Sequence, residues 1–336
     1  MKIVVDAYGS DLGAEAVAEG AALALKRAGG FSVVLAGKKE ELEALFDKYG
    51  GDRMRAEFLD APDAVTNDDV PTTAIRTKPN SSLAKGLELL ASDSAAAAFV
   101  SAGSTGAVLT AAFLKVGRLK NIMRPALAPL LPTVTGGSVV MTDCGANVDC
   151  KPQYLAQFAL MGAAFAEASG IKNPKVGLLS NGTEDKKGNE LTKEAFGLIS
   201  SAGLNFIGNV EGRDILTGAV DVVVADGFYG NIALKTAEGV AGAVFGLLKE
   251  GIKQGGLRAK LGALLLKPVL YGIKSKLDYN ERGGACFLGL KKVVIKAHGA
   301  SKASSIAAAI LQAKELAQAN IAENIENRLA SYSSAE

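Results

Sequence analysis

The sequence has few features that would place the chain outside the cell or within a membrane. Its three cysteines, Cys144, Cys150 and Cys286, form no CxxC pair and are odd in number. This pattern argues against a disulfide framework or a zinc site and favours reduced, intracellular thiols. The apolar run before Asp6 is too short for a signal peptide, and no later segment has about 18 uncharged apolar residues. We therefore expect a cytoplasmic protein.

The sequence also lacks an excess of charge of either sign. Lysine and arginine number 37 and aspartate and glutamate 35, which leaves a formal net charge of +2. This balance provides no global field for nucleic acid, so nucleic acid is not expected as a partner and a charged partner must meet a local patch. The acidic residues show no HExxH or other metal-ligand spacing, so no metal site is expected.

Aromatic residues are scarce, at 6%, whereas alanine and the 39 glycines supply much of the apolar content. This balance is typical of helices that pack closely on a parallel sheet. Uniformly apolar runs such as VVLA and DVVVA alternate with helical stretches, as expected for strands covered on both faces. The predicted strands are Lys2–Val5, Ser32–Leu35, Ala97–Val100, Ser138–Met141, Val176–Leu179, Asn205–Ile207 and Val220–Val224. The predicted fold is α/β, a three-layer α/β/α sandwich with a mostly parallel sheet, in one large catalytic domain over residues 1–336.

Five polar, glycine-rich junctions follow predicted strands. They are Asp6–Asp11, Ser101–Gly106, Asp143–Asp149, Ser180–Glu190 and Asp226–Asn231. In open sheets of this kind, ligands lie beyond the carboxyl ends of the strands. We therefore expect the ligand site at this edge of the sheet.

Two of these junctions have the chemistry of an anion site. SAGSTGA precedes a helix whose free N–H groups and dipole favour phosphate, although Gly103 and Gly106 can equally serve a tight turn alone. It matches neither a Walker A loop nor a dinucleotide fingerprint. SNGTEDKKGNEL places Lys186 and Lys187 at the end of a buried strand, where lysines can hold phosphate and stabilise charge on an attacked carbonyl. The alternative for this second junction is a solvated charged loop.

The other candidate residues have structural alternatives. Asp226 and Asn231 flank a glycine-rich turn, where helix capping alone is a sufficient explanation. His298 is the only histidine and lies near a strand end, where a structural role is the commoner one. Cys144 as a nucleophile would need His298 as its base.

One region, from Lys249 to Tyr279, breaks the alternation of strands and helices. Lysines and an arginine surround a leucine stripe at helical spacing, formed by Leu257, Leu261, Leu264 and Leu265. Pro268 is expected to break or kink the chain before a second helical piece. Residues 249–280 are therefore predicted to form a protruding amphipathic helical hairpin. The stretch from Lys302 to about Leu329 is predicted to be one helix.

The five junctions together resemble those of the PlsX family, the acyl-acyl carrier protein:phosphate acyltransferases of bacterial phospholipid synthesis. The resemblance runs nearly end to end and includes RPALAPLLPT (Arg124–Thr133), GANVDCKP (Gly145–Pro152), GTEDKKGNELTK (Gly182–Lys193), NFIGNVEGRD (Asn205–Asp214), ADGFYGN (Ala225–Asn231) and KAHGAS (Lys296–Ser301). The chain departs from the family at DAYGSD, usually DAMGGD, and at Ser104, usually asparagine. The family usually has apolar residues where Cys144 and Cys150 stand, which argues against either thiol as a nucleophile.

The resemblance implies a fold like those of isocitrate dehydrogenase and phosphotransacetylase, and a reaction in which inorganic phosphate attacks a fatty acyl thioester. The products would be an acyl phosphate and free carrier protein, and no cofactor is required. Lys187 would stabilise charge, Asn231 would donate a hydrogen bond to phosphate or oxyanion, and His298 would protonate the leaving thiol. The candidate substrate- and phosphate-binding residues are Asp6, Gly103, Ser104, Thr105, Gly106, Gly182, Thr183, Lys186 and Asp226.

The resemblance also implies a homodimer that associates peripherally with the membrane. Its partners would be acyl carrier protein, inorganic phosphate, an anionic membrane surface and the membrane acyltransferase that consumes acyl phosphate. The hairpin residues expected to contact membrane or carrier protein are Arg258, Lys260, Leu261, Leu264, Leu265 and Lys267. The leucine stripe can instead pack across a dimer interface.

The residues alone leave other functions open. A relative with the same sandwich can be a phosphotransacetylase that uses acyl-CoA, or a dehydrogenase of the isocitrate type, although a nucleotide fingerprint and an acidic metal cluster are missing. A non-catalytic scaffold at the membrane surface, recruiting lipid enzymes through the hairpin, would function without Lys187.

Overall fold

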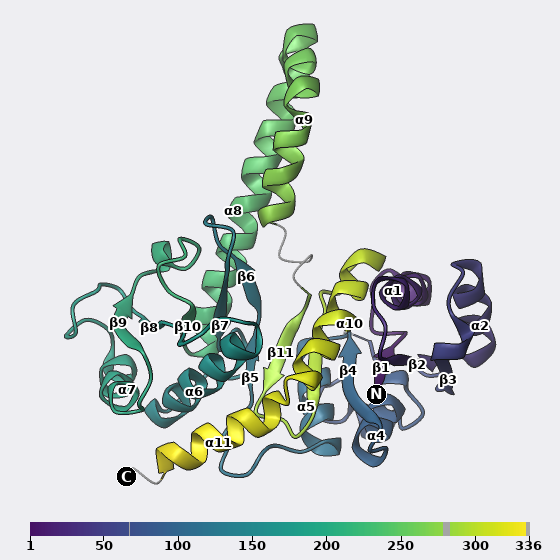
Figure 1. The fold of residues 1–336 in the computed structure, drawn as a ribbon, viewed down its shortest axis with the longest axis horizontal. Coiled ribbons are helices and arrows are strands. Elements are labelled where there is room, and N and C mark those ends of the chain that lie inside the picture. Colours follow the sequence, from purple (N-terminus) through teal and green to yellow (C-terminus); the bar gives the residue numbers. More distant parts are fainter. Residues whose placement is uncertain (67, 278–282, 334–336) are drawn as a thin grey trace.

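The fold of this chain is seen in a computed structural model that describes residues 1–66, 68–277 and 283–333. Within these residues the strands form two mostly parallel sheets, and a long helical pair projects from the body (Figure 1). The larger sheet has the order β3 (Ala56–Asp60), β2 (Ser32–Gly37), β1 (Lys2–Asp6), β4 (Ala96–Ser101), β12 (Val293–Lys296), β11 (Ala285–Leu288) and β5 (Ala126–Ala128). The smaller has the order β6 (Leu130–Pro132), β7 (Ser138–Thr142), β10 (Val222–Val224), β8 (Val176–Leu179) and β9 (Phe206–Val210).

The α/β sandwich with mostly parallel pairing is confirmed, but the expectation of one sheet is wrong. Among the described strands, β11 runs antiparallel to β12 and β5, and β6 runs antiparallel to β7. The chain passes from the larger sheet to the smaller at Pro129, between β5 and β6. These two strands have three residues each and lie between prolines, which weakens the strand signal in the sequence.

Helices cover both faces of the larger sheet. On one face lie α1 (Gly13–Arg27) and α10 (Ala303–Gln318), and on the other α4 (Ser82–Ser92) and α5 (Thr105–Lys115). The smaller sheet packs on α6 (Pro152–Ala168) and α7 (Glu190–Ser200), and α11 (Ile321–Ser333) lies on α6. Two short helices, α2 (Lys39–Lys48) and α3 (Ala74–Thr77), complete the part that surrounds the larger sheet.

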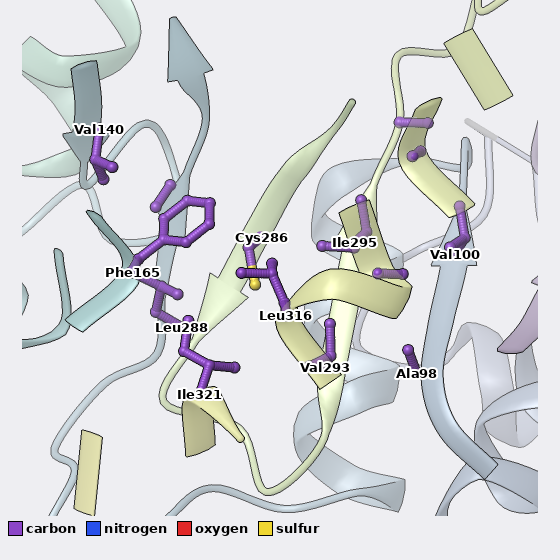
Figure 2. Close-up of a cluster of buried hydrophobic side chains, with 14 of the residues drawn as sticks. Ala98, Val100, Val140, Phe165, Cys286, Leu288, Val293, Ile295, Leu316 and Ile321 are labelled. Atoms are coloured by element: carbon purple, nitrogen blue, oxygen red, sulfur yellow. The ribbon is translucent and has the colours of Figure 1, made fainter. Parts of the chain in front are cut away.

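One apolar core extends from the larger sheet to the smaller. Figure 2 shows Ile295 of β12 and Leu288 of β11 near Leu316 of α10, and Phe165 of α6 beside Val140 of β7. All five side chains are buried, and each stabilises the fold by about 1.5–3 kcal/mol. This shared core holds the facing edges of the two sheets together. One large domain over residues 1–336 stays a prediction, which the continuous core supports.

The protruding hairpin consists of α8 (Gly227–Gln254) and α9 (Gly256–Leu277), and so begins earlier than predicted. The break predicted at Pro268 is wrong, because α9 continues through this residue. The chain reverses instead at Gly255 and Gly256, where the φ of +66° at Gly256 favours glycine. Residues 278–280 of the predicted hairpin lie outside the described residues. No helix in the described part of the chain is long and apolar enough to cross a membrane.

The C-terminal segment forms two helices rather than the single helix predicted. The helix α10 ends at Gln318 and α11 begins at Ile321. Between them Asn320 adopts a φ of +49°, a left-handed conformation that asparagine tolerates better than most residues. The bend lets α11 leave the larger sheet and pack on α6 of the smaller one.

Candidate active site

Between the two sheets lies a cavity of about 200 Å³, here called the intersheet cavity. It receives Thr105 at the start of α5, Asn231 and Lys235 of α8, and Lys296 and His298 at the end of β12. Its other lining residues are Leu127, Pro129, Leu130, Cys144, Gly145, Leu234, Glu238, Gly283, Gly284, Ala285 and Ala297. The cavity thus joins the ends of strands from both sheets, where the parallel arrangement predicts a ligand.

Asn231 is positioned by close packing of the first turn of α8 on the loop after β7. Asp226 caps the helix, since its Oδ1 accepts a hydrogen bond from Tyr229 N at 2.9 Å. The N–H of Gly227 donates to the carbonyl of Asn147 at 2.8 Å. A Cβ added at Gly230 would lie only 1.9 Å from the carbonyl oxygen of Asp143. The helix can approach this closely only because glycine stands at these positions.

Asp143 holds that loop in place from beneath. Its Oδ1 accepts hydrogen bonds from Leu127 N at 2.8 Å and Ala146 N at 3.1 Å. Its Oδ2 accepts from Asn147 N at 2.7 Å and Asn147 Nδ2 at 2.9 Å. Burial raises the pKa of this fully buried carboxyl, and these hydrogen bonds oppose that rise. Asp143 is therefore a positioning residue for the loop that carries α8 and Asn231.

Gly230→Ala is expected to lower the free energy of unfolding by about 1–3 kcal/mol, because the new methyl group overlaps the carbonyl of Asp143. It should also lower activity by moving Asn231, its neighbour. Chemical denaturation and initial rates measure the two effects. Gly239→Ala is the matched control on the same helix, since nothing lies within 4 Å of its added Cβ. Wild-type stability in Gly230→Ala would contradict the packing described.

The loops after β1 and β4 pack on one another. Asp6 is buried, and its carboxylate accepts hydrogen bonds from Ser82 Oγ at 2.6 Å and Ser101 Oγ at 2.7 Å. A Cβ at Gly9 would lie 2.6 Å from Gly103 N. Of the residues proposed for this part of the phosphate site, Thr105 lines the intersheet cavity, whereas the Asp6 carboxylate is engaged by protein groups. Gly103, Ser104 and Gly106 lie next to Thr105 but do not line the cavity.

The two departures in DAYGSD have structural contacts. Tyr8 Oη donates a hydrogen bond to the Glu41 carboxylate, and burial together with Glu41 raises the pKa of Tyr8 to about 12. Ser10 Oγ donates to the carbonyl of Gly299 at 3.3 Å, and Asp11 N donates to the same carbonyl at 2.9 Å. The second contact pins the segment after β12, which carries His298, to the loop after β1.

His298 faces the intersheet cavity with a defined orientation. The backbone N–H of Ala300 donates to Nδ1 at 3.2 Å. This bond leaves Nε2 to carry the proton of the neutral imidazole. The His298 ring is exposed, so it is a hydrogen-bond donor open to the cavity rather than a buried structural residue.

The charged loop after β8 lies beside a second cavity, of about 520 Å³. Its lining residues are Leu179, Ser180, Asn181, Gly188, Asn189, Thr192, Gly212, Ala225, Asp226, Tyr229, Ile232 and Ala233. Tyr229 and Ile232 face this cavity, whereas Asn231 and Lys235 face the intersheet cavity. The first turns of α8 therefore separate the two cavities.

Lys187 lines neither of these cavities. Its side chain is exposed, and its aliphatic part covers Gly182, where an added Cβ would lie 2.9 Å from Lys187 Cγ. Thr183 and Lys186 are exposed on the same loop. Neither of these two cavities brings Lys187 and Asn231 together, so their joint action stays a prediction.

The buried cysteine in the intersheet cavity has the properties of a thiol rather than a thiolate. Cys144 Sγ contacts the carbonyl of Met141 at 3.5 Å as a weak donor. Burial raises the pKa of Cys144 well above its usual value, and the neighbouring carboxylate of Asp143 raises it further. This environment agrees with the expectation that Cys144 is not a nucleophile.

A family model described as fatty acid synthesis protein matches residues 1–324. The chain belongs to this family. Among its relatives, the phosphate acyltransferase of Clostridium acetobutylicum is 46% identical over 330 residues, which are 98% of this chain and 99% of that protein. The phosphate acyltransferase of Bacillus thuringiensis is 46% identical over 328 residues, 97% of this chain and 98% of that protein. The PlsX resemblance of the sequence motifs is confirmed.

Solved structures share the fold of this PlsX-family chain at low sequence identity. The EutD phosphotransacetylase from Staphylococcus aureus has a TM-score of 0.63 and 19% identity, and the match covers 95% of this chain and 94% of that one. A phosphotransacetylase from Streptococcus pyogenes has a TM-score of 0.64 and 23% identity over the same shares. These likenesses confirm the phosphotransacetylase-like fold and nothing finer.

Two lysines of the intersheet cavity were not among the predicted site residues. Lys235 Nζ pairs with Glu238 at 2.7 Å. Lys296 is partly buried, and burial lowers its pKa to about 8. Lys296 is the first residue of the PlsX string KAHGAS. The sequence around a single lysine at a strand end does not indicate whether that lysine is buried or exposed. Lys235 lies one helical turn after Asn231, and that spacing was the available signal.

Proposed function

We propose that this PlsX-family chain transfers a fatty acyl group from acyl-acyl carrier protein to inorganic phosphate, giving acyl phosphate for phospholipid synthesis. The observation that carries the proposal is the intersheet cavity. It gathers two lysines, an asparagine and a histidine around the N-terminus of α5. Such a set of cations and donors suits phosphate and the oxyanion of an attacked thioester.

The chemistry needs a phosphate oxygen held against the thioester carbonyl. The phosphate oxygen forms the new bond to carbon, and the carbonyl oxygen takes up negative charge until the carbon–sulfur bond breaks. The free N–H groups at Thr105 and the ammonium groups of Lys235 and Lys296 favour the phosphate anion. Asn231 provides a neutral donor for the oxyanion, and His298 Nε2–H a second one.

The proposal keeps Lys187 as a residue that stabilises charge on the bound substrate. Its ammonium forms no salt bridge with any described residue, and its side chain is exposed. The same loop is tied to β9, because Asn209 Nδ2 donates to the carbonyl of Glu184 at 2.8 Å. For Lys187 to reach the phosphate, the loop must move its side chain toward the intersheet cavity, past the first turns of α8. Gly182 and Gly188 flank the turn that would carry this movement, and Gly188 has a φ of +103°.

The test of the proposed function is the release of thiol from acyl-acyl carrier protein by the purified protein, with and without phosphate. We expect release only when phosphate is present and without added nucleotide. Acyl-CoA is the comparison substrate, because the solved structures with this fold include phosphotransacetylases. Equal use of acyl-CoA would favour the phosphotransacetylase-like function, and thiol release without phosphate would contradict both.

The hairpin is proposed to contact an anionic membrane surface and to contribute to a homodimer. Leu257, Leu261, Leu264 and Leu265 are 85%, 59%, 63% and 75% exposed. An exposed leucine stripe beside Arg258, Lys260 and Lys267 suits the boundary between lipid headgroups and acyl chains. Acyl carrier protein, being acidic, would be attracted by the same cations.

Replacing Leu261, Leu264 and Leu265 together with glutamate is expected to weaken binding to anionic vesicles at least 100-fold, since each buried leucine contributes about 1.5–3 kcal/mol. Vesicle co-sedimentation measures this. Leu12→Glu is the control, because Leu12 is 50% exposed and lies on the body of the protein. Sedimentation velocity separates the alternative use of the stripe: conversion of a dimer to monomer would place it in the dimer interface.

A further inference from the structure

We propose that Lys296 protonates the leaving thiol of the acyl thioester, an inference that rests on the proposed function. The other polar side chains that line the intersheet cavity include Thr105, Asn231, Lys235, Glu238 and His298. The proposed function uses His298 Nε2–H as a donor to the oxyanion, so Lys296 takes the role that the resemblance gave to His298. Asn231 has no proton to transfer at neutral pH. The Lys235 ammonium is already paired with Glu238, and its side chain is 55% exposed, so it lies partly in solvent.

The backbone of Lys296 is fixed on both sides. In β12, Lys296 pairs with Ser101 of β4 in parallel and with Ala285 of β11 in antiparallel register. The next N–H, of Ala297, donates to the carbonyl of Ser101 at 2.8 Å. A side chain on a strand paired at both edges is placed more accurately than one on a loop such as that of Lys187.

The charges around Lys296 leave its ammonium weakly stabilised. Its Nζ donates to the carbonyl of Ala297, and no salt bridge joins it to a carboxylate within the described residues. Asp11, in the loop after β1, favours the charged form, whereas Lys235 of α8 disfavours it. The carboxylate of Glu238, on α8, forms a salt bridge with Lys235. His298 lies two residues after Lys296 and lines the same cavity. Burial is the largest effect and lowers the Lys296 pKa to about 8.

A pKa of about 8 suits a group that protonates a leaving thiolate. A thiol ordinarily has a pKa of about 8.5, and proton transfer is most efficient between groups of similar pKa. When the phosphate oxygen bonds to the acyl carbon, the carbon–sulfur electron pair moves to sulfur, and the Lys296 ammonium gives sulfur its proton. The neutral amine then takes the proton of the hydrogen phosphate group that became the acyl phosphate. Hydrogen phosphate and thioester are thus converted to acyl phosphate dianion and thiol with no net proton uptake.

The test compares acyl thioesters whose leaving thiols differ in pKa. Lys296→Arg keeps the charge but cannot release a proton at neutral pH. With the alkyl thioester of pantetheine, we expect kcat/KM to fall about 10²–10³-fold. With an aromatic thioester, whose thiolate leaves without protonation, we expect a fall of less than about tenfold. The wild-type decrease in kcat above about pH 8 should disappear in Lys296→Arg, because deprotonation of Lys296 causes it.

A second variant covers the case in which arginine does not fit. Lys296→Ala leaves room for a small amine, and ethylamine should restore activity on the alkyl thioester. Lys291→Ala, which removes an exposed lysine before β12, should keep wild-type activity and show no amine effect. Equal losses on both thioesters together with no amine rescue would overturn the role of Lys296. Wild-type protein that forms no acyl phosphate from either thioester would instead overturn the proposed function itself.

Discussion

Asn231→Ala is expected to lower kcat about 10²–10³-fold, the loss observed when one preorganised donor to an oxyanion is removed. Within the described residues no protein group forms a hydrogen bond with the Asn231 side chain, which lines the intersheet cavity. The backbone of the same helical turn is held in place, because the N–H of Gly227 donates to the carbonyl of Asn147. Its amide is therefore available to substrate, and its loss should not expose an unpaired partner. Single-turnover rates with acyl-acyl carrier protein measure the effect on the chemical step.

Controls for Asn231 come from the same helix. Thr236→Ala removes an exposed polar side chain of α8 and should leave kcat unchanged. Asn231→Asp keeps the shape but replaces a donor with a negative charge, so it should be at least as inactive as Asn231→Ala. An Asn231→Ala enzyme with a wild-type kcat would exclude Asn231 from the oxyanion site.

Lys187→Met is expected to lower kcat/KM for phosphate about 100-fold, because a cation would be lost from the transition state while the fold is kept. The Lys187 ammonium is exposed, so a large loss of activity cannot arise from a lost core contact. Lys187→Arg should recover part of the activity, since charge is kept and geometry changes.

The matched control for Lys187 is Lys193→Met, which removes an exposed lysine at the start of α7. Initial rates at several phosphate concentrations separate an effect on phosphate affinity from one on kcat. Unchanged kinetics in Lys187→Met would assign the loop a solvated surface role. Growth supported by Lys187→Met in cells that lack the native enzyme would favour the scaffold function.

The parallel strands were predictable because their residues are apolar on both faces. All seven predicted strands occur, and those predicted at Ser32–Leu35 and Val220–Val224 form β2 and β10, in which every residue but Ser32 is buried. The strands Ala126–Ala128 and Leu130–Pro132 were missed, since Pro125, Pro129 and Pro132 interrupt their short apolar runs. The chain passes from one sheet to the other between these two strands, so the division into two sheets was missed with them.

The sequence predicted that the candidate site lies at the carboxyl ends of the strands, but it did not predict which residues share a cavity. Thr105 and Asn231, from two of the junctions, and His298, from another predicted strand end, share the intersheet cavity, and their roles stay predictions. Helical spacing groups Asn231 with Lys235, but the sequence contains no signal for which cavity this face of α8 meets. In the structure Asn231 lines the intersheet cavity, whereas the loop of Lys187 lies beside the second cavity. Lys296 and Asp143 acquire their properties from burial, which depends on the tertiary packing of β12 and of the loop after β7.

The most direct test of acyl transfer to phosphate uses radiolabelled inorganic phosphate with acyl-acyl carrier protein. If phosphate attacks the thioester carbonyl, label enters an acyl phosphate in a one-to-one ratio with released thiol, and no acyl group remains on the protein. Thiol release without labelled acyl phosphate, or an acyl group bound covalently to the enzyme, would contradict direct transfer in the intersheet cavity.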